Sequence, residues 1–426
     1  MTGSTTGITA ADKSENGGAK SDREACGHDA PGSSVMESQR ARVARARTLA
    51  APIIDTVLLK VASRCNINCR YCYVYNMGDT GWASQPKRMT RATLEAVVQS
   101  LADLSRSQDR AFAVVLHGGE PLLLGHVKLA FLLSALREYL PANCPISIQT
   151  NGILISDEIL GACSEHRVTL GISIDGPKPV HDRFRVDHQG VGTFKRVLNG
   201  IDKLRNHPDS NQLFTGVLAV IDPASDPRQI YSFFKELGAP SVDFLYRDGD
   251  HSRLPRGKES VRSTEFGEWL SELLDIYLSD TDPIRIRLLD DMMKLLMGSS
   301  GTKEGVGTTE FGIVIIDTDG SIRKNDTLKS NYDGADLFER QWSVHTHSIE
   351  SAVSTPEFAA YLALQRPSAA ACRICPEFSV CGGGMPVNRW RDGHGYDNPT
   401  VYCADQLRLI GHMRNRICTL VPAHRP

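Results

Sequence analysis

At residues 65–72 the chain reads Cys65-Asn66-Ile67-Asn68-Cys69-Arg70-Tyr71-Cys72. These three cysteines have the spacing C-x3-C-x2-C, and they follow directly on an apolar run that predicts a strand over 55–62. Three thiolates on one short loop can hold three irons of a cubane [4Fe–4S] cluster and leave the fourth iron open to another molecule. Zinc is the alternative, but it prefers four closed ligands, and the next histidine downstream is His117.

Outward from this loop, short apolar runs alternate with longer amphipathic stretches. Strands are predicted over 55–62, 113–117, 146–150, 169–174, 214–221 and 242–246. Helices are predicted near 90–105, 126–139, 156–166, 193–206 and 227–237. Repeated strand–helix units predict an α/β fold with a parallel sheet, which is either doubly wound or a full or partial barrel. In each case the reactive groups belong at the carboxyl ends of the strands.

Unusual residues do follow those predicted strands. The cysteine loop follows the first strand and Gly118-Gly119-Glu120 the second, while Asn151-Gly152 follows the third and Ser173-Ile174-Asp175-Gly176 the fourth. Because the carboxyl ends of parallel strands meet at one edge of a sheet, we expect these four segments to form one site.

A second cysteine group lies near the end of the chain, in the pattern Cys372-x2-Cys375-x5-Cys381-x21-Cys403. Four thiolates close a metal site, and this spacing suits structural zinc or a fully ligated [4Fe–4S] cluster equally. Helix is expected over 263–297 and near 350–364, and a hairpin with an Asp319-Gly320 turn over 311–323.

Composition narrows the class of protein. The 426 residues carry 48 Lys and Arg against 50 Asp and Glu, so the net charge of −2 offers no basic field for nucleic acid. No apolar run is long enough to span a membrane. The 11 cysteines are an odd number on a chain that opens without an export signal, which favours a cytoplasmic protein over a disulfide scaffold. Residues 1–50 are predicted to be disordered, with arginines 40, 42, 45 and 47 as a solvated helical stripe.

The loop Cys65–Cys72, with an aromatic residue at Tyr71, resembles the signature of the radical S-adenosylmethionine (SAM) superfamily. The resemblance implies a partial (β/α)6 barrel of the TIM type. It also implies that the open iron of the cluster binds the methionine part of SAM. Reductive cleavage of SAM would then give a 5′-deoxyadenosyl radical that abstracts hydrogen from an unactivated C–H bond.

The same resemblance implies the residues that contact SAM. Gly118-Gly119-Glu120 is similar to the family's Gly-Gly-Glu motif, in which the glycines admit the ligand and the carboxylate accepts from the SAM ammonium. The stretch from Ser173 to Arg185 is similar to one in the peptide-modifying branch, where a serine serves the SAM ribose and an arginine its carboxylate. Arg183 is the alternative to Arg185. Asn151 is expected to contact SAM or substrate, or else to be a satisfied turn residue.

The second cysteine group, followed by Gly382-Gly383-Gly384, resembles the SPASM domain, which normally carries seven cysteines and two auxiliary clusters. Three of the expected ligands are absent: Asn325 and Met385 stand at two positions, and residues 300–312 hold no cysteine. The resemblance therefore implies one auxiliary [4Fe–4S] cluster, on Cys372, Cys375, Cys381 and Cys403. The predicted domains are a partial barrel over 51–250, a helical bridging region over 251–310 and a SPASM-like domain over 311–426.

Longer phrases over about residues 53–415, such as Tyr73-Val74-Tyr75-Asn76 and Tyr402-Cys403-Ala404-Asp405, resemble the FxsB-type peptide maturases. This implies a substrate that is a ribosomally made precursor peptide. It also implies a crosslink of the cyclophane type, from an aromatic ring to a side-chain β-carbon. Asp326 matches a proton-transfer residue of sulfatase-maturing relatives, with a turn-capping role as its alternative. An external one-electron reductant, similar to flavodoxin or ferredoxin, completes the expected partners.

Two other functions explain part of the sequence. A formylglycine-forming sulfatase maturase has the same barrel and cysteine loop, but the missing ligands of the first auxiliary cluster count against it. An iron–sulfur electron carrier or scaffold would explain the cysteines, but it leaves Gly119, Glu120, Ser173 and Arg185 without a role.

Overall fold

The structure is a computed structural model, and it describes residues 52–108 and 110–420. The described residues lie within one compact unit. The segment predicted to be disordered, its arginine stripe and Cys26 lie outside the described residues. Among the helices that the structure describes, none is both long and apolar enough to cross a membrane.

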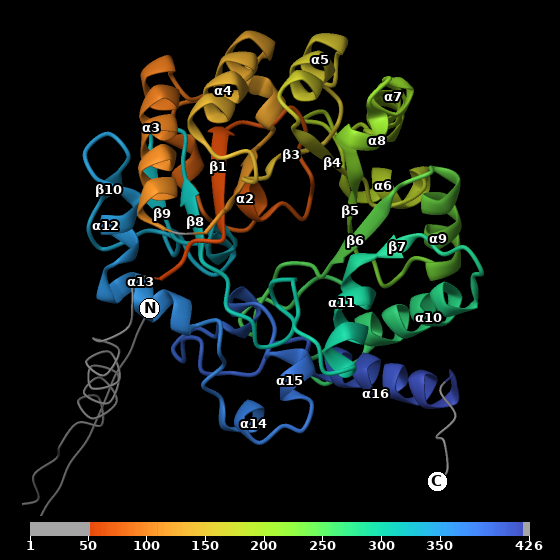
Figure 1. The fold of residues 1–426 in the computed structure, drawn as a ribbon. Helices are drawn as coiled ribbons and strands as arrows, with labels where there is room; N and C mark the ends of the chain where they lie inside the picture. The colour runs from red at the N-terminus through yellow and green to blue at the C-terminus, as the bar shows by residue number, and fades with distance from the viewer. Residues whose placement is uncertain (1–51, 109, 421–426) are drawn as a thin grey trace, which may run out of the picture. The chain divides into compact units, whose positions relative to one another are not determined.

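One curved sheet organises the fold (Figure 1). Its strand order is β10-β9-β8-β1-β2-β3-β4-β5-β6-β7, and the neighbours from β8 through β7 are parallel. The strands are β1 (Thr56–Ala62), β2 (Ala113–Gly118), β3 (Ile146–Thr150), β4 (Thr169–Ser173), β5 (Phe214–Val220), β6 (Ser241–Leu245), β7 (Arg285–Ile286), β8 (Ile313–Ile316), β9 (Ser321–Arg323) and β10 (Trp342–Ser343). The predicted partial barrel of strand–helix units is confirmed.

Helices cover the outer, convex face of this sheet (Figure 1). Those of the barrel are α3 (Arg91–Ser107), α4 (His126–Tyr139), α5 (Asp157–Glu165), α6 (Lys178–Phe184), α7 (Phe194–Asn206), α8 (Ser210–Leu213) and α9 (Pro227–Glu236). The short helix α2 (Tyr73–Asn76) instead follows the cysteine loop beyond the carboxyl end of β1. The start of α3 shows why they form: the Thr90 side chain accepts a hydrogen bond from Thr93 N–H, and the apolar face of the helix is buried. Alternating burial along β2 and β3 shows that each strand packs one side against these helices.

The later part of the chain adds to the same sheet before it leaves the barrel. The predicted hairpin forms as β8 and β9, and β8 also pairs in parallel with β1, so the hairpin extends the barrel sheet. The remaining helices are α10 (Glu265–Ser279), α11 (Arg287–Leu296), α12 (Ile349–Val353), α13 (Pro356–Ala363), α14 (Ala370–Arg373), α15 (Phe378–Cys381) and α16 (Cys403–Leu420). The domain boundaries at 250 and 310 stay a prediction.

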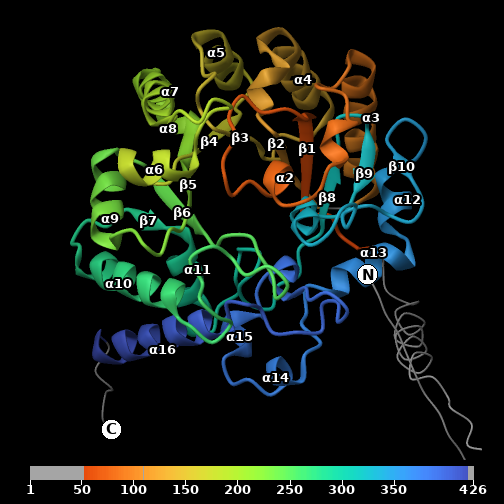
Figure 2. The same cartoon turned by 180° about the vertical axis from the view of Figure 1, so that it is seen from behind.

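Helix α16 lies against α10 in both views (Figures 1 and 2). A Cβ on Gly267 would lie 2.5 Å from the Asp405 carbonyl oxygen, so the two helices meet at a position where only glycine fits. This contact attaches the segment that carries Cys403 to the barrel.

Candidate active site

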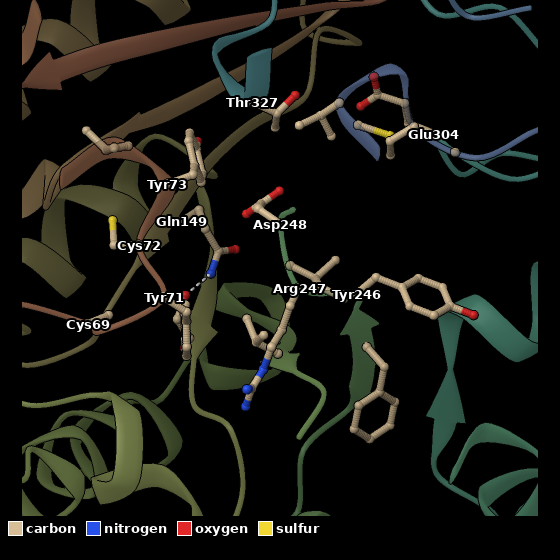
Figure 3. Close-up of a pocket in the computed structure, with 18 of the residues that line it drawn as sticks. Cys69, Tyr71, Cys72, Tyr73, Gln149, Tyr246, Arg247, Asp248, Glu304 and Thr327 are labelled. Atoms are coloured by element: carbon tan, nitrogen blue, oxygen red, sulfur yellow. Dashed lines mark hydrogen bonds between the residues drawn. The ribbon is translucent and has the colours of Figure 1, made fainter. Parts of the chain in front are cut away.

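A cavity of about 530 Å³ opens at the carboxyl ends of the barrel strands. Cys65, Cys69 and Cys72 line one part of it, and the far wall comes from the later part of the chain, where Glu304 and Thr327 lie (Figure 3). The predicted meeting of the strand-end segments is therefore present. Residues from all four of the expected segments line this cavity: Gly118, Gly119, Asn151 and Ser173 besides the cysteines.

Arg185 lines the cavity and carries an unused donor. Its Nη1 donates to the Tyr71 hydroxyl at 2.9 Å, and that hydroxyl donates to Asp175 at 2.6 Å. The Arg185 Nε is buried without a hydrogen-bond partner among the described residues. By contrast, Arg183 donates to Asp222 at 2.7 Å and does not line the cavity. Of the two arginines, Arg185 is therefore the one that can receive a carboxylate from a bound ligand.

Ser173 and Asn151 face the cavity from β4 and from the end of β3. The Ser173 hydroxyl accepts a hydrogen bond from Gln149 Nε2 at 2.9 Å, which leaves its own proton available to a ligand. Asn151 is more fully engaged, since its side chain donates to Asn66 at 2.7 Å and accepts from Ile153 N–H at 3.1 Å. Its contact with SAM or substrate stays a prediction.

The Gly118-Gly119-Glu120 turn is tightly built. A Cβ on Gly119 would lie 2.0 Å from the Tyr75 hydroxyl and 2.4 Å from the Arg64 carbonyl oxygen, so only glycine fits beside the cysteine loop. Glu120 is fully buried and does not line the cavity. Its carboxylate accepts from Leu122 N–H, the Thr150 hydroxyl and Asn151 N–H, at 3.0, 2.6 and 2.8 Å. In this structure Glu120 holds two strand ends together, and its contact with the SAM ammonium stays a prediction.

The second cysteine group surrounds a small cavity of about 40 Å³, which Cys372, Cys375, Cys381 and Cys403 all line. The rest of that wall is mostly apolar, with Phe378 and Leu407 among its residues. Cys403 is the first residue of α16, and Cys381 the last of α15. The fold thus gathers the four thiols that the sequence predicts as one ligand set.

Both groups fit iron–sulfur clusters by the chemistry of their donors. Burial raises the pKa of the Cys65 thiol to about 12 and that of the Cys381 thiol to about 12, so both thiols are neutral without metal. Binding to a metal cluster stabilises the thiolate form and releases the proton. In the described residues no three His, Cys, Asp or Glu side chains are close enough to hold a single metal ion. A cubane cluster inserts a whole core between its thiolates, and the two cysteine-lined cavities are compatible with that wider spacing.

The three positions without the expected cysteines meet in space. The Asn325 side chain donates to Glu304 at 3.1 Å, and a Cβ on Gly305 would lie 2.9 Å from Cγ of Met385. Loop 300–312, Asn325 and Met385 thus pack together where a second auxiliary cluster would need thiolates. Glu304 and Met385 also line the large cavity.

Asp326 lies behind the wall of that cavity. Its carboxylate pairs with Lys60 at 3.1 Å, both side chains are buried, and it accepts from the Tyr73 hydroxyl at 3.2 Å. Burial by itself raises the pKa of Asp326, but the charges of Lys60, His117 and Lys329, with the hydrogen bond to Lys60, lower it below its usual value. Tyr73 lines the cavity and Asp326 does not, so Asp326 reaches a substrate through Tyr73.

Sequence reasoning missed two carboxyl groups that line the cavity, Asp248 and Glu304. Burial and then the Asp326 charge raise the pKa of Asp248 to about 7, and burial raises that of Glu304 to about 7. For Asp248 there was a signal: the residue follows the sixth predicted strand at its carboxyl end, the position that singled out the other segments. Nothing in the sequence pointed to Glu304, which lies in a Gly- and Thr-rich loop.

A parallel barrel that carries three thiols and an arginine with a free Nε at its carboxyl edge fits an enzyme that binds a cofactor through an open cluster. The family model of the Radical SAM superfamily matches residues 59–224. The chain thus contains a radical SAM domain and is an enzyme of the radical SAM oxidoreductase type. Its cofactors are accordingly SAM and [4Fe–4S] iron–sulfur centres.

Two curated relatives cover most of the chain. The cysteine-type anaerobic sulfatase-maturating enzyme of Clostridium perfringens (strain 13 / Type A) is 24% identical over 80% of this chain and 90% of its own length. The serine-type anaerobic sulfatase-maturating enzyme of Bacteroides thetaiotaomicron is 26% identical over 83% of this chain and 87% of its own length.

Solved structures share the fold. Native anSMEcpe with bound AdoMet superposes with a TM-score of 0.74 at 21% identity, and the match covers 86% of this chain and 98% of that one. Streptococcus suis SuiB bound to precursor peptide SuiA superposes with a TM-score of 0.57 at 12% identity, over 89% of this chain and 82% of that one. Both structural matches extend beyond the barrel into the later part of the chain.

The four-thiol cavity leads to a prediction on metal content. Cys403→Ala should lower the iron of the anaerobically reconstituted protein from about eight to about four per chain, because three thiolates no longer close the second cluster. Iron and acid-labile sulfide analysis measures this. Cys418→Ala on the same helix α16 is the matched control, since Cys418 is exposed and far along the helix from Cys403. Equal iron in the two variants would contradict the ligand assignment.

Proposed function

We propose that this enzyme installs an intramolecular crosslink in a ribosomally made precursor peptide, joining an aromatic ring to a side-chain β-carbon. Support for a peptide substrate comes from the likeness to SuiB, whose solved complex contains the precursor peptide SuiA. Support for crosslinking comes from the FxsB-type phrases of the sequence, which extend from the cysteine loop to Asp405.

One observation carries the choice between this function and sulfatase maturation. Loop 300–312, Asn325 and Met385 contact one another without a thiol among them, and Glu304 and Met385 face the large cavity. The resemblance to the SPASM domain implies a further auxiliary cluster at these positions. In this chain Glu304 and Met385 at these positions line the cavity instead of holding a cluster. This arrangement favours a bulkier substrate segment, such as one that carries an aromatic ring.

The chain's own residues have defined tasks in this proposal. When bound, SAM and its cluster supply the abstraction of a hydrogen atom from carbon. Arg185, with its free Nε, binds a carboxylate of the cofactor, and Gly119 lets the turn pack against Tyr75 and Arg64 beside the cysteine loop. Tyr73, held by Asp326, forms the wall that faces the peptide and helps to exclude water. Lys60 keeps Asp326 ionised so that this wall stays in place.

Formylglycine formation is the second candidate, because the two curated relatives described above are sulfatase-maturating enzymes that align over most of the chain. It uses the same hydrogen abstraction, from a cysteine or serine side chain. The two proposals differ in the product of the later steps, since one makes a ring-to-carbon bond and the other an aldehyde.

Co-expression with the short reading frame next to the gene tests the proposal. We expect the encoded peptide to lose two hydrogens per crosslink and to give no backbone fragments between the two joined residues in tandem mass spectrometry. A serine converted to formylglycine loses the same mass, so the mass alone does not decide. An aldehyde reacts with a hydrazide probe and leaves the fragment series complete. A hydrazide-reactive product would overturn the crosslinking proposal in favour of the second candidate.

A further inference from the structure

Asp248 is a carboxylate that points into the cavity with no partner. It lies three residues beyond β6, and Figure 3 shows it in the middle of the cavity, between the cysteine loop and Glu304. Within the described residues, the carboxylate has no ion pair and no hydrogen bond except one from its own backbone. The Asp248 side chain is partly exposed to the cavity, so its carboxylate is available to a molecule bound there.

The neighbouring carboxylate, Asp326, has the opposite environment. Lys60 and the Tyr73 hydroxyl occupy its two oxygens, at 3.1 and 3.2 Å, and Tyr73 separates it from the cavity. Two carboxyl groups therefore lie on either side of one tyrosine, and only Asp248 is free to exchange a proton with a molecule in the cavity. Carboxyl pairs whose surroundings drive their pKa values apart are a recurrent arrangement for acid–base chemistry.

The other charged and titratable groups around Asp248 are already engaged or lie farther along the wall. Lys303 pairs with Asp243 at 2.8 Å and Arg287 with the same carboxylate at 3.5 Å, so neither cation neutralises Asp248. The groups that face it are Tyr73 and Asp326 from α2 and the turn 326–330, Tyr402 from the segment before α16, and Glu304 from loop 300–312. Arg247, the preceding residue, pairs with Asp222 at 3.4 Å.

We propose that Asp248 is the catalytic residue that takes the proton from the peptide, and that Asp326 is a positioning residue that holds Tyr73. This rests on the proposed function, in which the ring that forms the new bond must lose a proton. The ring C–H bond breaks, its electron pair stays in the ring, and the proton goes to the Asp248 carboxylate. The surplus electron goes to a one-electron acceptor of the iron–sulfur class. Burial and the Asp326 charge raise the pKa of Asp248 to about 7, which suits a group that exchanges protons at neutral pH.

The test compares reconstituted holoenzyme carrying Asp248→Asn, Asp326→Asn or Glu304→Gln with the natural protein, using the peptide from the neighbouring reading frame. Asp248→Asn should lower crosslinked product at least about 100-fold while 5′-deoxyadenosine still forms, because hydrogen abstraction precedes proton transfer. The rise of the product rate with pH, with an apparent pKa of about 7, should vanish in this variant and persist unchanged in Glu304→Gln. In Asp326→Asn the rise should persist but move to lower pH, because the Asp326 charge helps to raise the pKa of Asp248. Asp248→Glu should restore part of the rate.

A second readout needs no turnover. Infrared difference spectra of Asp248→Asn against the natural protein should reveal a protonated carboxyl band that titrates with a midpoint of about 7. Product formation by Asp248→Asn at the natural rate, or loss of the pH dependence in Glu304→Gln instead, would overturn the assignment. A natural enzyme that gives no product lacking two hydrogens would refute the proposed function, whereas the infrared band would still decide whether Asp248 titrates. If Asp248→Asn does not assemble its iron–sulfur clusters, the assignment is tested by the partial rate of Asp248→Glu and by the infrared titration of the natural protein.

Discussion

Cys69→Ala should abolish SAM cleavage, with 5′-deoxyadenosine falling to background. Cys69 lines the large cavity together with Cys65 and Cys72, and no other cysteine of the described residues lines that cavity. Two remaining thiolates cannot hold a cubane cluster in place, so the open iron that should bind SAM is lost. Iron should fall from about eight to about four per chain. Anaerobic reconstitution, followed by iron analysis and chromatography of the SAM products, measures both effects.

Cys163→Ala is the matched control for this substitution. Cys163 is a free thiol like Cys69, but it is buried in α5 and lines neither cysteine cavity. Its replacement should leave iron content and SAM cleavage unchanged. Retained cleavage in Cys69→Ala would refute the assignment of the cluster loop, and so would equal losses in both variants.

Lys258→Met should lower the free energy of unfolding by about 3–5 kcal/mol, because it leaves a buried carboxylate without its partner. The Lys258 ammonium lies 2.6 Å from the Asp405 carboxylate, and both side chains are fully buried. Asp405 also accepts from Gly267 N–H at 2.9 Å, at the point where α10 and α16 meet. This ion pair therefore joins the helix that carries Cys403 to the rest of the fold. Denaturant unfolding under anaerobic conditions measures the change.

Two further variants test whether the loss of stability comes from the buried, uncompensated charge. Adding Asp405→Asn to Lys258→Met removes the uncompensated charge and keeps an acceptor for Gly267, so the double variant should recover much of the lost stability. Glu95→Gln breaks the exposed pair between Arg91 and Glu95 and should cost less than about 1 kcal/mol. A Lys258→Met protein as stable as Glu95→Gln would show that the buried pair contributes little.

Much of the barrel was predictable because its signals are local. The strand β3 and the helix α4 have the predicted bounds, since alternation and helical periodicity are properties of neighbouring residues. Helix α16 was not among the predicted helices, and it packs against α10, which lies more than a hundred positions earlier in the chain. The hairpin was predicted, but its pairing with β1 joins residues more than two hundred positions apart, which no local pattern encodes.

By itself the sequence determined the cysteine loop, the strand-end motifs and the absence of three expected thiols, because the spacing of ligands on a short loop is a local property. Only the tertiary structure decided which side chains face the cavity. It placed Asp326 behind Tyr73, buried Glu120 among hydrogen-bond donors and left Asp248 facing the cavity without a partner among the described residues. Burial and hydrogen bonding depend on contacts between segments that are distant in the sequence. It also brought loop 300–312, Asn325 and Met385 together, so that residues at the positions without cysteine form part of the cavity wall.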